Sequence, residues 1–116
     1  MAGEDSPYIV VLTTLGSTED AHRFVRALVE RRLVACGTIV PGARSVYRWE
    51  GRIADEHEAI VFLKTRRDRW PELVHAARAL HPYKVPELIA LAVSDGLPAY
   101  LDWVAGETLT QEPSQR

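Results

Sequence analysis

Cysteine and long apolar runs are both scarce in this chain of 116 residues. The single cysteine, Cys36, excludes an internal disulfide framework and favours a reducing compartment. No apolar run approaches the roughly 20 residues that a helix needs to cross a bilayer. Residues 1–7 lack the basic and apolar parts of a signal peptide. We therefore expect a cytoplasmic, unprocessed protein with no membrane partner.

An excess of basic residues is also missing. The 14 Lys and Arg residues are outnumbered by 16 Asp and Glu residues, which gives a formal net charge of −2. Binding to nucleic acid depends on a basic surface that neutralises phosphates, so this class of partner is disfavoured.

Local catalytic and binding motifs are absent as well. The sequence has no P-loop, no G-x-G-x-x-G, no H-E-x-x-H, no C-x-x-C and no G-x-S-x-G. The four histidines, His22, His57, His75 and His81, include no i,i+4 pair. Any site must therefore be assembled from distant elements or across subunits.

Three short apolar runs are present, at residues 9–12, 59–63 and 88–93. An unbroken apolar run rich in Ile, Val and Phe is typical of a strand covered on both faces. Helical spacing of apolar residues predicts helices over 17–32, with Ser17 as the N-cap, and over 68–80, with Asp68 as the N-cap. Two helices cover about one face of a small sheet. We expect the second face to pack against other copies of the chain.

A long, bent strand is predicted over residues 35–53, with a kink at Pro41-Gly42 and a turn around Ala54-Asp55 before the central strand. Its second half alternates, and this places Tyr47 and Trp49 on one face. Such aromatic residues are typical interface anchors. The alternative is an aromatic cluster packed within the same chain.

The predicted order is β-α-β-β-α-β followed by a short helix from Pro98. This order indicates an α+β, ferredoxin-like sandwich with both main helices on one face of an antiparallel sheet. The length predicts one domain, which we place at residues 8–106. Residues 1–7 and 107–116 carry no pattern, and we expect mobile tails there.

Polar residues at the predicted strand and helix ends are the candidates for chemistry. A thiolate and a neutral imidazole suit copper or zinc, and Cys36 and His81 supply one each. Each also has a plainer explanation, Cys36 as a small buried hydrophobe and His81 as a helix C-terminal residue favoured by the dipole. Lys64 and Glu87 flank apolar strands, where they point either into a pocket or into solvent.

Several segments in order resemble the CutA divalent-cation tolerance proteins, over about Ile9 to Val104. They are Ala35-Cys36, Ser45-x-Tyr47-x-Trp49-x-Gly51-x-Ile53, Lys64-Thr65, His81-Pro82-Tyr83-x-Val85-Pro86-Glu87 and Tyr100-Leu101-x-Trp103. The resemblance implies a cytoplasmic, non-enzymatic homotrimer of PII-like architecture, with the long arms pairing between subunits. It also implies a role in tolerance to copper and other divalent cations.

The resemblance further implies weak binding of a divalent metal, with Cu(II) foremost, at subunit boundaries. Cys36, His81 and Glu87 are the implied ligands, and Tyr47, Trp49, Lys64 and Tyr83 would line the cleft between subunits. The chain departs from some members of the family at three positions. Thr13 replaces a Cys and Leu80 replaces a His, so two metal ligands of those members are missing here. Lys84 replaces the usual Glu and places a positive charge beside the implied metal site.

Two rival functions are open at this point. One is a small-molecule sensor in which Lys64 and Arg48 hold an anionic metabolite in the inter-subunit cleft. The other is an enzyme in which Cys36 and His81 form a nucleophile and base pair, although no third residue that would orient the pair is apparent.

Overall fold

The computed structural model describes residues 6–109 and confirms the predicted order of elements. The elements are β1 (Tyr8–Leu15), α1 (Thr18–Glu30), β2 (Cys36–Trp49), β3 (Arg52–Arg66), the 3-10 turn η1 (Arg67–Arg69), α2 (Trp70–Leu80), β4 (Ile89–Ala92) and α3 (Pro98–Glu107). Within the described part of the chain, no helix is both long and apolar enough to span a membrane.

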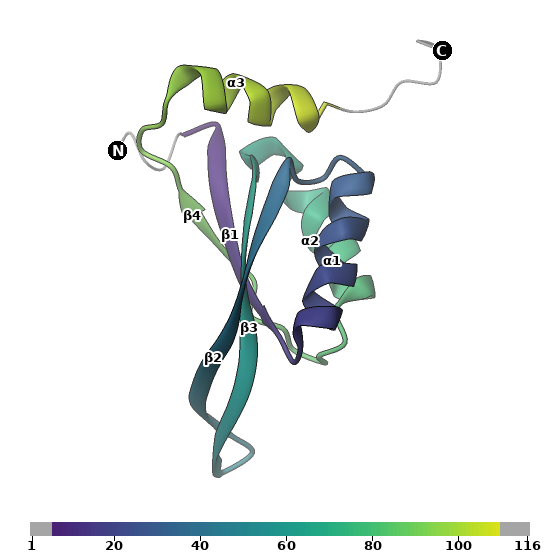
Figure 1. Ribbon diagram of the computed structural model, residues 1–116, viewed down its shortest axis with the longest axis vertical. Helices are drawn as coiled ribbons and strands as arrows, with labels where there is room; N and C mark the ends of the chain where they lie inside the picture. Colours follow the sequence, from purple (N-terminus) through teal and green to yellow (C-terminus); the bar gives the residue numbers. More distant parts are fainter. Residues whose placement is uncertain (1–5, 110–116) are drawn as a thin grey trace.

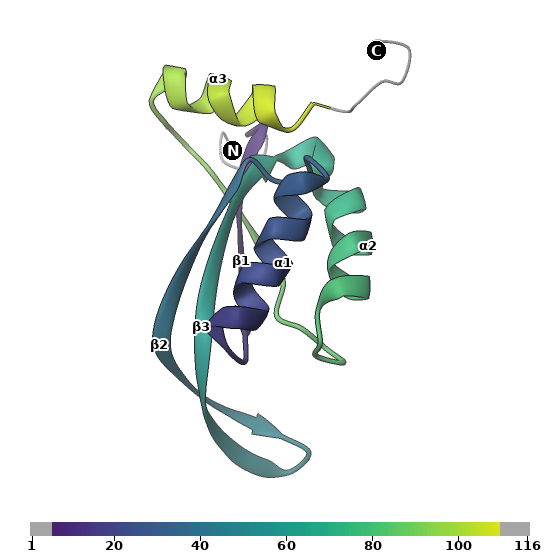
Figure 2. The ribbon, with the colours of Figure 1, turned by 45° about the vertical axis from the view of Figure 1, so that its right-hand side comes forward.

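The four strands form one antiparallel sheet in the order β2-β3-β1-β4. Both α1 and α2 lie on the same side of this sheet, and α3 runs across one end of it (Figures 1 and 2). This is the ferredoxin-like sandwich expected from the sequence, with a further helix at its C-terminal end.

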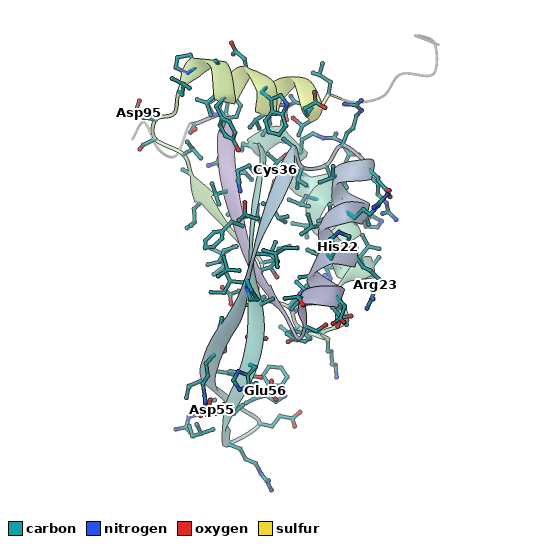
Figure 3. All side chains as sticks on the ribbon, viewed as in Figure 1. His22, Arg23, Cys36, Asp55, Glu56 and Asp95 are labelled. Atoms are coloured by element: carbon teal, nitrogen blue, oxygen red, sulfur yellow. The ribbon has the colours of Figure 1, made fainter. Side chains whose placement is uncertain are left out.

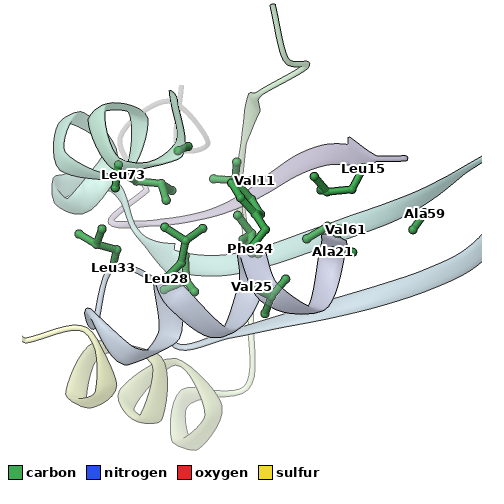
Figure 4. Packing of buried hydrophobic residues seen from close by; sticks show 14 of the residues in the cluster. Val11, Leu15, Ala21, Phe24, Val25, Leu28, Leu33, Ala59, Val61 and Leu73 are labelled. Carbon is green, nitrogen blue, oxygen red and sulfur yellow. The ribbon is translucent and has the colours of Figure 1, made fainter. Parts of the chain in front are cut away.

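The core lies between the sheet and the two main helices (Figure 4). Helix α1 begins as predicted, because the Ser17 hydroxyl oxygen accepts a hydrogen bond from the Asp20 backbone N–H at 3.1 Å. Its apolar stripe and the alternate residues of β1 and β3 interdigitate in the core. The fully buried members include Ile9, Val11, Leu15, Ala21, Leu28, Val61, Leu63 and Leu73.

The opposite face of the sheet is covered by no element among residues 6–109 except at one end, where Tyr100 of the helix α3 contacts Cys36. The register places Leu12 opposite both Phe62 and Ile89, and Val10 opposite Leu91, so apolar side chains from neighbouring strands share this face. We call it the bare face; its members are Val10, Leu12, Cys36, Thr38, Val40, Ile60, Phe62, Lys64, Ile89 and Leu91. The side chains of Val40, Ile89 and Leu91 are 41%, 46% and 48% exposed.

The hairpin turn differs from its predicted place. The expected turn around Ala54-Asp55 is wrong, because the chain reverses at Glu50-Gly51, with Trp49 paired to Arg52. Both turn residues have positive φ, 50° and 79°, as a two-residue turn that matches the strand twist requires. Strand β2 therefore ends at Trp49, four residues before its predicted end, and β3 begins at Arg52. Together the two strands form an arm that extends beyond the body of the molecule (Figure 1).

The kink in β2 is confirmed, since the register shifts between Val40 and Ala43 and Gly42 has a φ of 79°. The second helix begins later than predicted. Asp68 does not cap it; η1 precedes α2, and the Asp68 carboxylate instead accepts a hydrogen bond from Arg66 Nη1 at 2.8 Å. The helix ends at Leu80, as expected from the following His81-Pro82.

The ends of the described chain are held by hydrogen bonds. The Arg67 backbone N–H donates to the Pro7 carbonyl at 2.7 Å, and Arg67 Nε donates to the Ser6 carbonyl at 2.9 Å. Helix α3 continues to Glu107, and the buried Thr108 accepts a bond from Arg66 Nε. The remaining parts of the expected tails, residues 1–5 and 110–116, lie outside the described residues.

Candidate functional site

His81, the first residue after α2, is buried at the end of β1. Its ring lies 5.2 Å from that of Phe24 and 4.9 Å from that of Tyr83, measured between centroids. The Nε2 atom is 2.9 Å from the Thr14 carbonyl oxygen, and Nδ1 accepts the Tyr83 backbone N–H at 3.1 Å. A carbonyl oxygen only accepts, so Nε2 carries the ring proton. Both ring nitrogens are therefore engaged within the chain.

Burial lowers the pKa of His81, because the apolar surroundings disfavour the imidazolium. The Thr14 carbonyl and the carboxylates of Glu58 and Asp20 act in the opposite direction without reversing the shift. The ring is therefore held as a neutral imidazole, the form that metals bind. Metal binding through Nδ1 would cost its hydrogen bond with Tyr83.

A phenol and a carboxylate meet beside His81. The Tyr83 hydroxyl donates to Glu58 Oε2 at 2.6 Å, and Glu58 is only 6% exposed. Tyr83 reaches this carboxylate past Gly16, where an added Cβ would lie 3.5 Å from the tyrosine oxygen. Burial, and then the bond to Glu58, raise the pKa of Tyr83 well above its usual value.

A second pair of the same kind lies farther along the arm. The Tyr47 hydroxyl donates to Glu56 Oε1 at 2.9 Å, and this bond raises the pKa of Tyr47. Glu56 and Glu58 are two residues apart on β3, so they share one face of the strand. Our sequence reasoning missed both carboxylates. The signal was an acidic Glu56-His57-Glu58 segment directly before the apolar run of the central strand.

Cys36 lies at the other end of the sheet, under α3 (Figure 3). Its sulfur is 3.6 Å from the Tyr100 hydroxyl oxygen, and this contact raises the pKa of Tyr100 to about 12. Lys64 is its partner in the β2–β3 register, and the Lys64 amine donates to the Thr38 hydroxyl at 2.6 Å. The thiol thus belongs to the bare face and is half-buried.

Cys36 and His81 do not meet within one chain. Cys36 pairs with Lys64, whereas Thr14, the partner of His81, pairs with Ile60. These β3 positions are four residues apart, or about 13 Å at the usual strand rise. The cysteine is on the bare face, and the histidine packs against Phe24 of the helix layer. One chain cannot place both on one ion, nor use them as a nucleophile and base.

Glu87 is exposed and lies in the segment before β4. Across residues 6–109, no group of three or more His, Cys, Asp or Glu residues is arranged to hold a metal ion. The ligands implied by the sequence therefore do not fit a metal ion within one chain, and a site made from them needs residues of more than one copy.

The residues expected to line a cleft are also spread out. Tyr47 and Trp49 lie on the arm, and Trp49 is 47% exposed. No ring contact involves Tyr47 or Trp49 in the described region, so the structure does not show the alternative aromatic cluster within the chain. Arg48 pairs with Ile53, which is eleven residues from Lys64 along β3, or about 36 Å. Arg48 and Lys64 cannot hold one anion within a single chain.

The three departures from the CutA pattern lie in different surroundings. Thr13 is buried, and its hydroxyl oxygen is 3.3 Å from His81 Nε2, so this position does border the histidine. Leu80 packs at the edge of the core, and Lys84 is exposed.

A two-helix layer on one face of an antiparallel sheet, with a long arm and a bare apolar face, places the chain among the small α+β proteins of the ferredoxin-like class. The family model described as "CutA1 divalent ion tolerance protein" matches residues 9–107. The chain therefore belongs to the CutA divalent-cation tolerance family.

The relatives agree with this assignment. The "Divalent-cation tolerance protein CutA" of Thermus thermophilus is 46% identical over 99 residues, which cover 85% of this chain and 96% of that protein. A solved structure of a divalent cation tolerance protein (Cut A1) from the same organism has a TM-score of 0.84 at 44% identity, covering 87% of this chain and 98% of that one. "Protein CutA, chloroplastic" of Arabidopsis thaliana is 38% identical over 88% of this chain, which spans just over half (56%) of that protein.

Proposed function

We propose that this protein serves divalent-cation tolerance as a cytoplasmic homotrimer, which binds divalent metal ions, including Cu(II), at the boundaries between its copies. Membership of the CutA family supports the connection with divalent cations. The observation that carries the proposal is the bare apolar face of the sheet, with Cys36 at its edge. In this proposal the protein binds metal and is not an enzyme.

Self-association explains the exposed apolar surface. Monomeric proteins rarely expose a contiguous apolar patch of this kind. The arm adds Val46, Trp49 and Ile53, which are 65%, 47% and 61% exposed. Strand β2 is also an edge strand of fourteen residues, whose outer backbone groups suit pairing with another chain. A second copy supplies the same surfaces, and the number of three copies follows from the resemblance to CutA proteins.

Association also explains how separated ligands could serve one ion. Cys36 lies on the bare face, so contact between copies brings its thiol to a boundary. Glu87 is exposed and free to reach another copy, whereas His81 would first have to give up its bond with Tyr83. A metal held in this way is bound weakly, because ligand rearrangement opposes binding.

The assembly is tested by native mass spectrometry of the wild-type chain and a Leu91→Lys variant. A lysine on the bare face would bury an unpaired charge between copies, so we expect monomers to replace trimers. Val29→Lys is the matched control, since Val29 is 38% exposed but belongs to α1 on the helix layer. A wild-type chain that remains monomeric at micromolar concentration would overturn the assembly.

The metal is tested by stepwise addition of Cu(II) in the same instrument. We expect uptake in multiples of three ions per trimer, and reduced uptake by Cys36→Ala and by Glu87→Gln. These two residues are half-buried and exposed, so both variants should fold. A trimer that takes up no copper would contradict metal binding and leave the assembly standing.

A further inference from the structure

Lys64 is the charged member of the bare face, which is otherwise mainly apolar. In the register of the sheet it lies between Cys36 of β2 and Val10 of β1. Its half-buried amine donates to the Thr38 hydroxyl at 2.6 Å and to the Phe62 carbonyl at 3.4 Å, and both acceptors are neutral. Lys64 forms no ion pair with any of residues 6–109. One end of the face therefore carries a positive charge without a carboxylate to balance it.

The same side of β3 carries the opposite charge on the arm. Glu56 and Glu58 are separated from Lys64 by even numbers of residues, so all three share one face of the strand. Each glutamate accepts a hydrogen bond from a neutral phenol, Glu56 from Tyr47 and Glu58 from Tyr83. Neither is in an ion pair within the described part of the chain. This end of the face is therefore negative, again without compensation.

A single chain cannot bring these opposite charges together. Lys64 and Glu56 are eight residues apart on β3, or about 26 Å at the usual strand rise. Figure 3 shows Glu56 on the arm and Cys36, the register partner of Lys64, at the other end of the sheet. When another copy covers the bare face, Lys64 loses water, and an unpaired charge in such surroundings is strongly destabilising. Another copy carries the same two glutamates, so it can supply the missing carboxylate.

We propose that the Lys64 ammonium of one copy pairs with the Glu56 carboxylate of the next copy, and that this pair fixes how the copies are aligned. The proposal rests on the self-association proposed above. Glu56 is the exposed member of the acidic pair, and Tyr47 occupies only its Oε1 atom, while Glu58 adds to the negative potential. Each copy gives one amine and one carboxylate, so the pairs close around a ring of identical copies. Arg52 lies on the same face of β3, but it is exposed beside the hairpin turn, where water solvates its charge.

The first experiment is a dilution series of the full chain with a metal chelator, followed by native mass spectrometry. Lys64→Gln and Glu56→Gln should each raise the protein concentration at which half of the chains are trimeric by about tenfold or more, because each leaves a buried charge unpaired. The double variant removes both charges, so its loss should be smaller than the sum of the single losses. Arg52→Gln is the matched control, and its trimer should be as stable as that of the wild type.

Charge reversal gives the second test. Lys64→Glu and Glu56→Lys should each yield monomers, which far-UV circular dichroism should show to be folded. Lys64→Glu/Glu56→Lys exchanges the two charges and should restore the trimer, and the separation within one chain means that this recovery comes from contact between copies. A wild-type trimer whose stability changes with neither Lys64→Gln nor Glu56→Gln, or additive losses without recovery on exchange, would overturn the pairing and leave the assembly standing. A wild-type chain that stays monomeric would instead overturn the self-association on which the pairing rests.

Discussion

The Nε2–H of His81 donates to the carbonyl oxygen of Thr14 at 2.9 Å, and this bond joins the end of α2 to the end of β1. On the other side of the ring, Nδ1 accepts the Tyr83 backbone N–H. The imidazole therefore satisfies a strand carbonyl and a loop amide that lie far apart in the chain. Its neutral form is a structural requirement, because a protonated Nδ1 would face another N–H donor.

The stability of the protein should fall as the pH drops below about 6.5, the usual pKa of histidine in an unfolded chain. Burial lowers the folded-state pKa of His81 below that value. Between the two pKa values the unfolded chain binds the additional proton, so the free energy of unfolding decreases as the pH falls and levels off below the folded-state pKa. Urea denaturation at a fixed protein concentration, from pH 7.5 down to pH 5.5, measures this slope.

The control compares two histidine variants. His81→Gln should lower the free energy of unfolding at pH 7.5 by about 1–3 kcal/mol and flatten its dependence on pH, because a buried acceptor loses its partner. His75→Gln changes an exposed residue and should keep both the stability and the slope of the wild type. An unchanged slope in His81→Gln would assign the pH dependence to other groups.

The Tyr83–Glu58 hydrogen bond should contribute more to stability than the Tyr47–Glu56 bond. Tyr83→Phe leaves the 6% exposed Glu58 carboxylate without its hydroxyl donor, and we expect a loss of about 1–3 kcal/mol. Tyr47→Phe removes a similar bond, of 2.9 Å, from a residue that is 38% exposed, so its effect should stay within about 0.5 kcal/mol. Chemical denaturation of both variants measures the two losses in the free energy of unfolding. Equal losses would contradict the expectation that the more buried hydrogen bond contributes more.

Much of the fold could be predicted because its signals are local. Ser17 and the apolar spacing after it define α1, and the proline after His81 marks the end of α2. The uncovered face could also be inferred, since three doubly buried strands outnumber the helices available to cover them. These predictions depend on periodicity and on neighbours in the sequence.

The turn position and the site could not be predicted in the same way. Only the β2 side of the hairpin alternates, and residues 55–58 on the other side are all polar, so the pattern alone fits several registers. The positive φ at Glu50 and Gly51 marks the register that forms. The contacts of His81 with Thr14 and of Tyr83 with Glu58 join residues that are far apart in the chain. The sequence placed Cys36 at the start of a strand and His81 at the end of a helix, but it did not indicate that the two side chains lie on opposite faces of the sheet.

A methyl group at Gly37 should destabilise the protein, because this glycine lets β2 approach α1. A Cβ there would lie 2.7 Å from Val25 Cγ1 and 2.9 Å from Leu63 Cδ2, both in the core. Overpacking of this kind typically costs about 1–3 kcal/mol, so Gly37→Ala should lower the free energy of unfolding by that amount. In Gly37→Ala/Val25→Ala the crowding by Val25 is relieved and only the contact with Leu63 remains, so the combined loss should be smaller than the sum of the two single losses.

Gly106→Ala is the matched control, measured by urea denaturation at the same protein concentration. An added Cβ at Gly106 meets no atom within 4 Å, and the residue lies in α3. Alanine is favoured over glycine in a helix by roughly 0.5–1 kcal/mol, so this variant should be as stable as the wild type or slightly more so. Opposite signs for the two alanine substitutions would confirm that contact with Val25 and Leu63 is the cause. A Gly37→Ala variant as stable as the wild type would show that the strand and helix can move apart without cost.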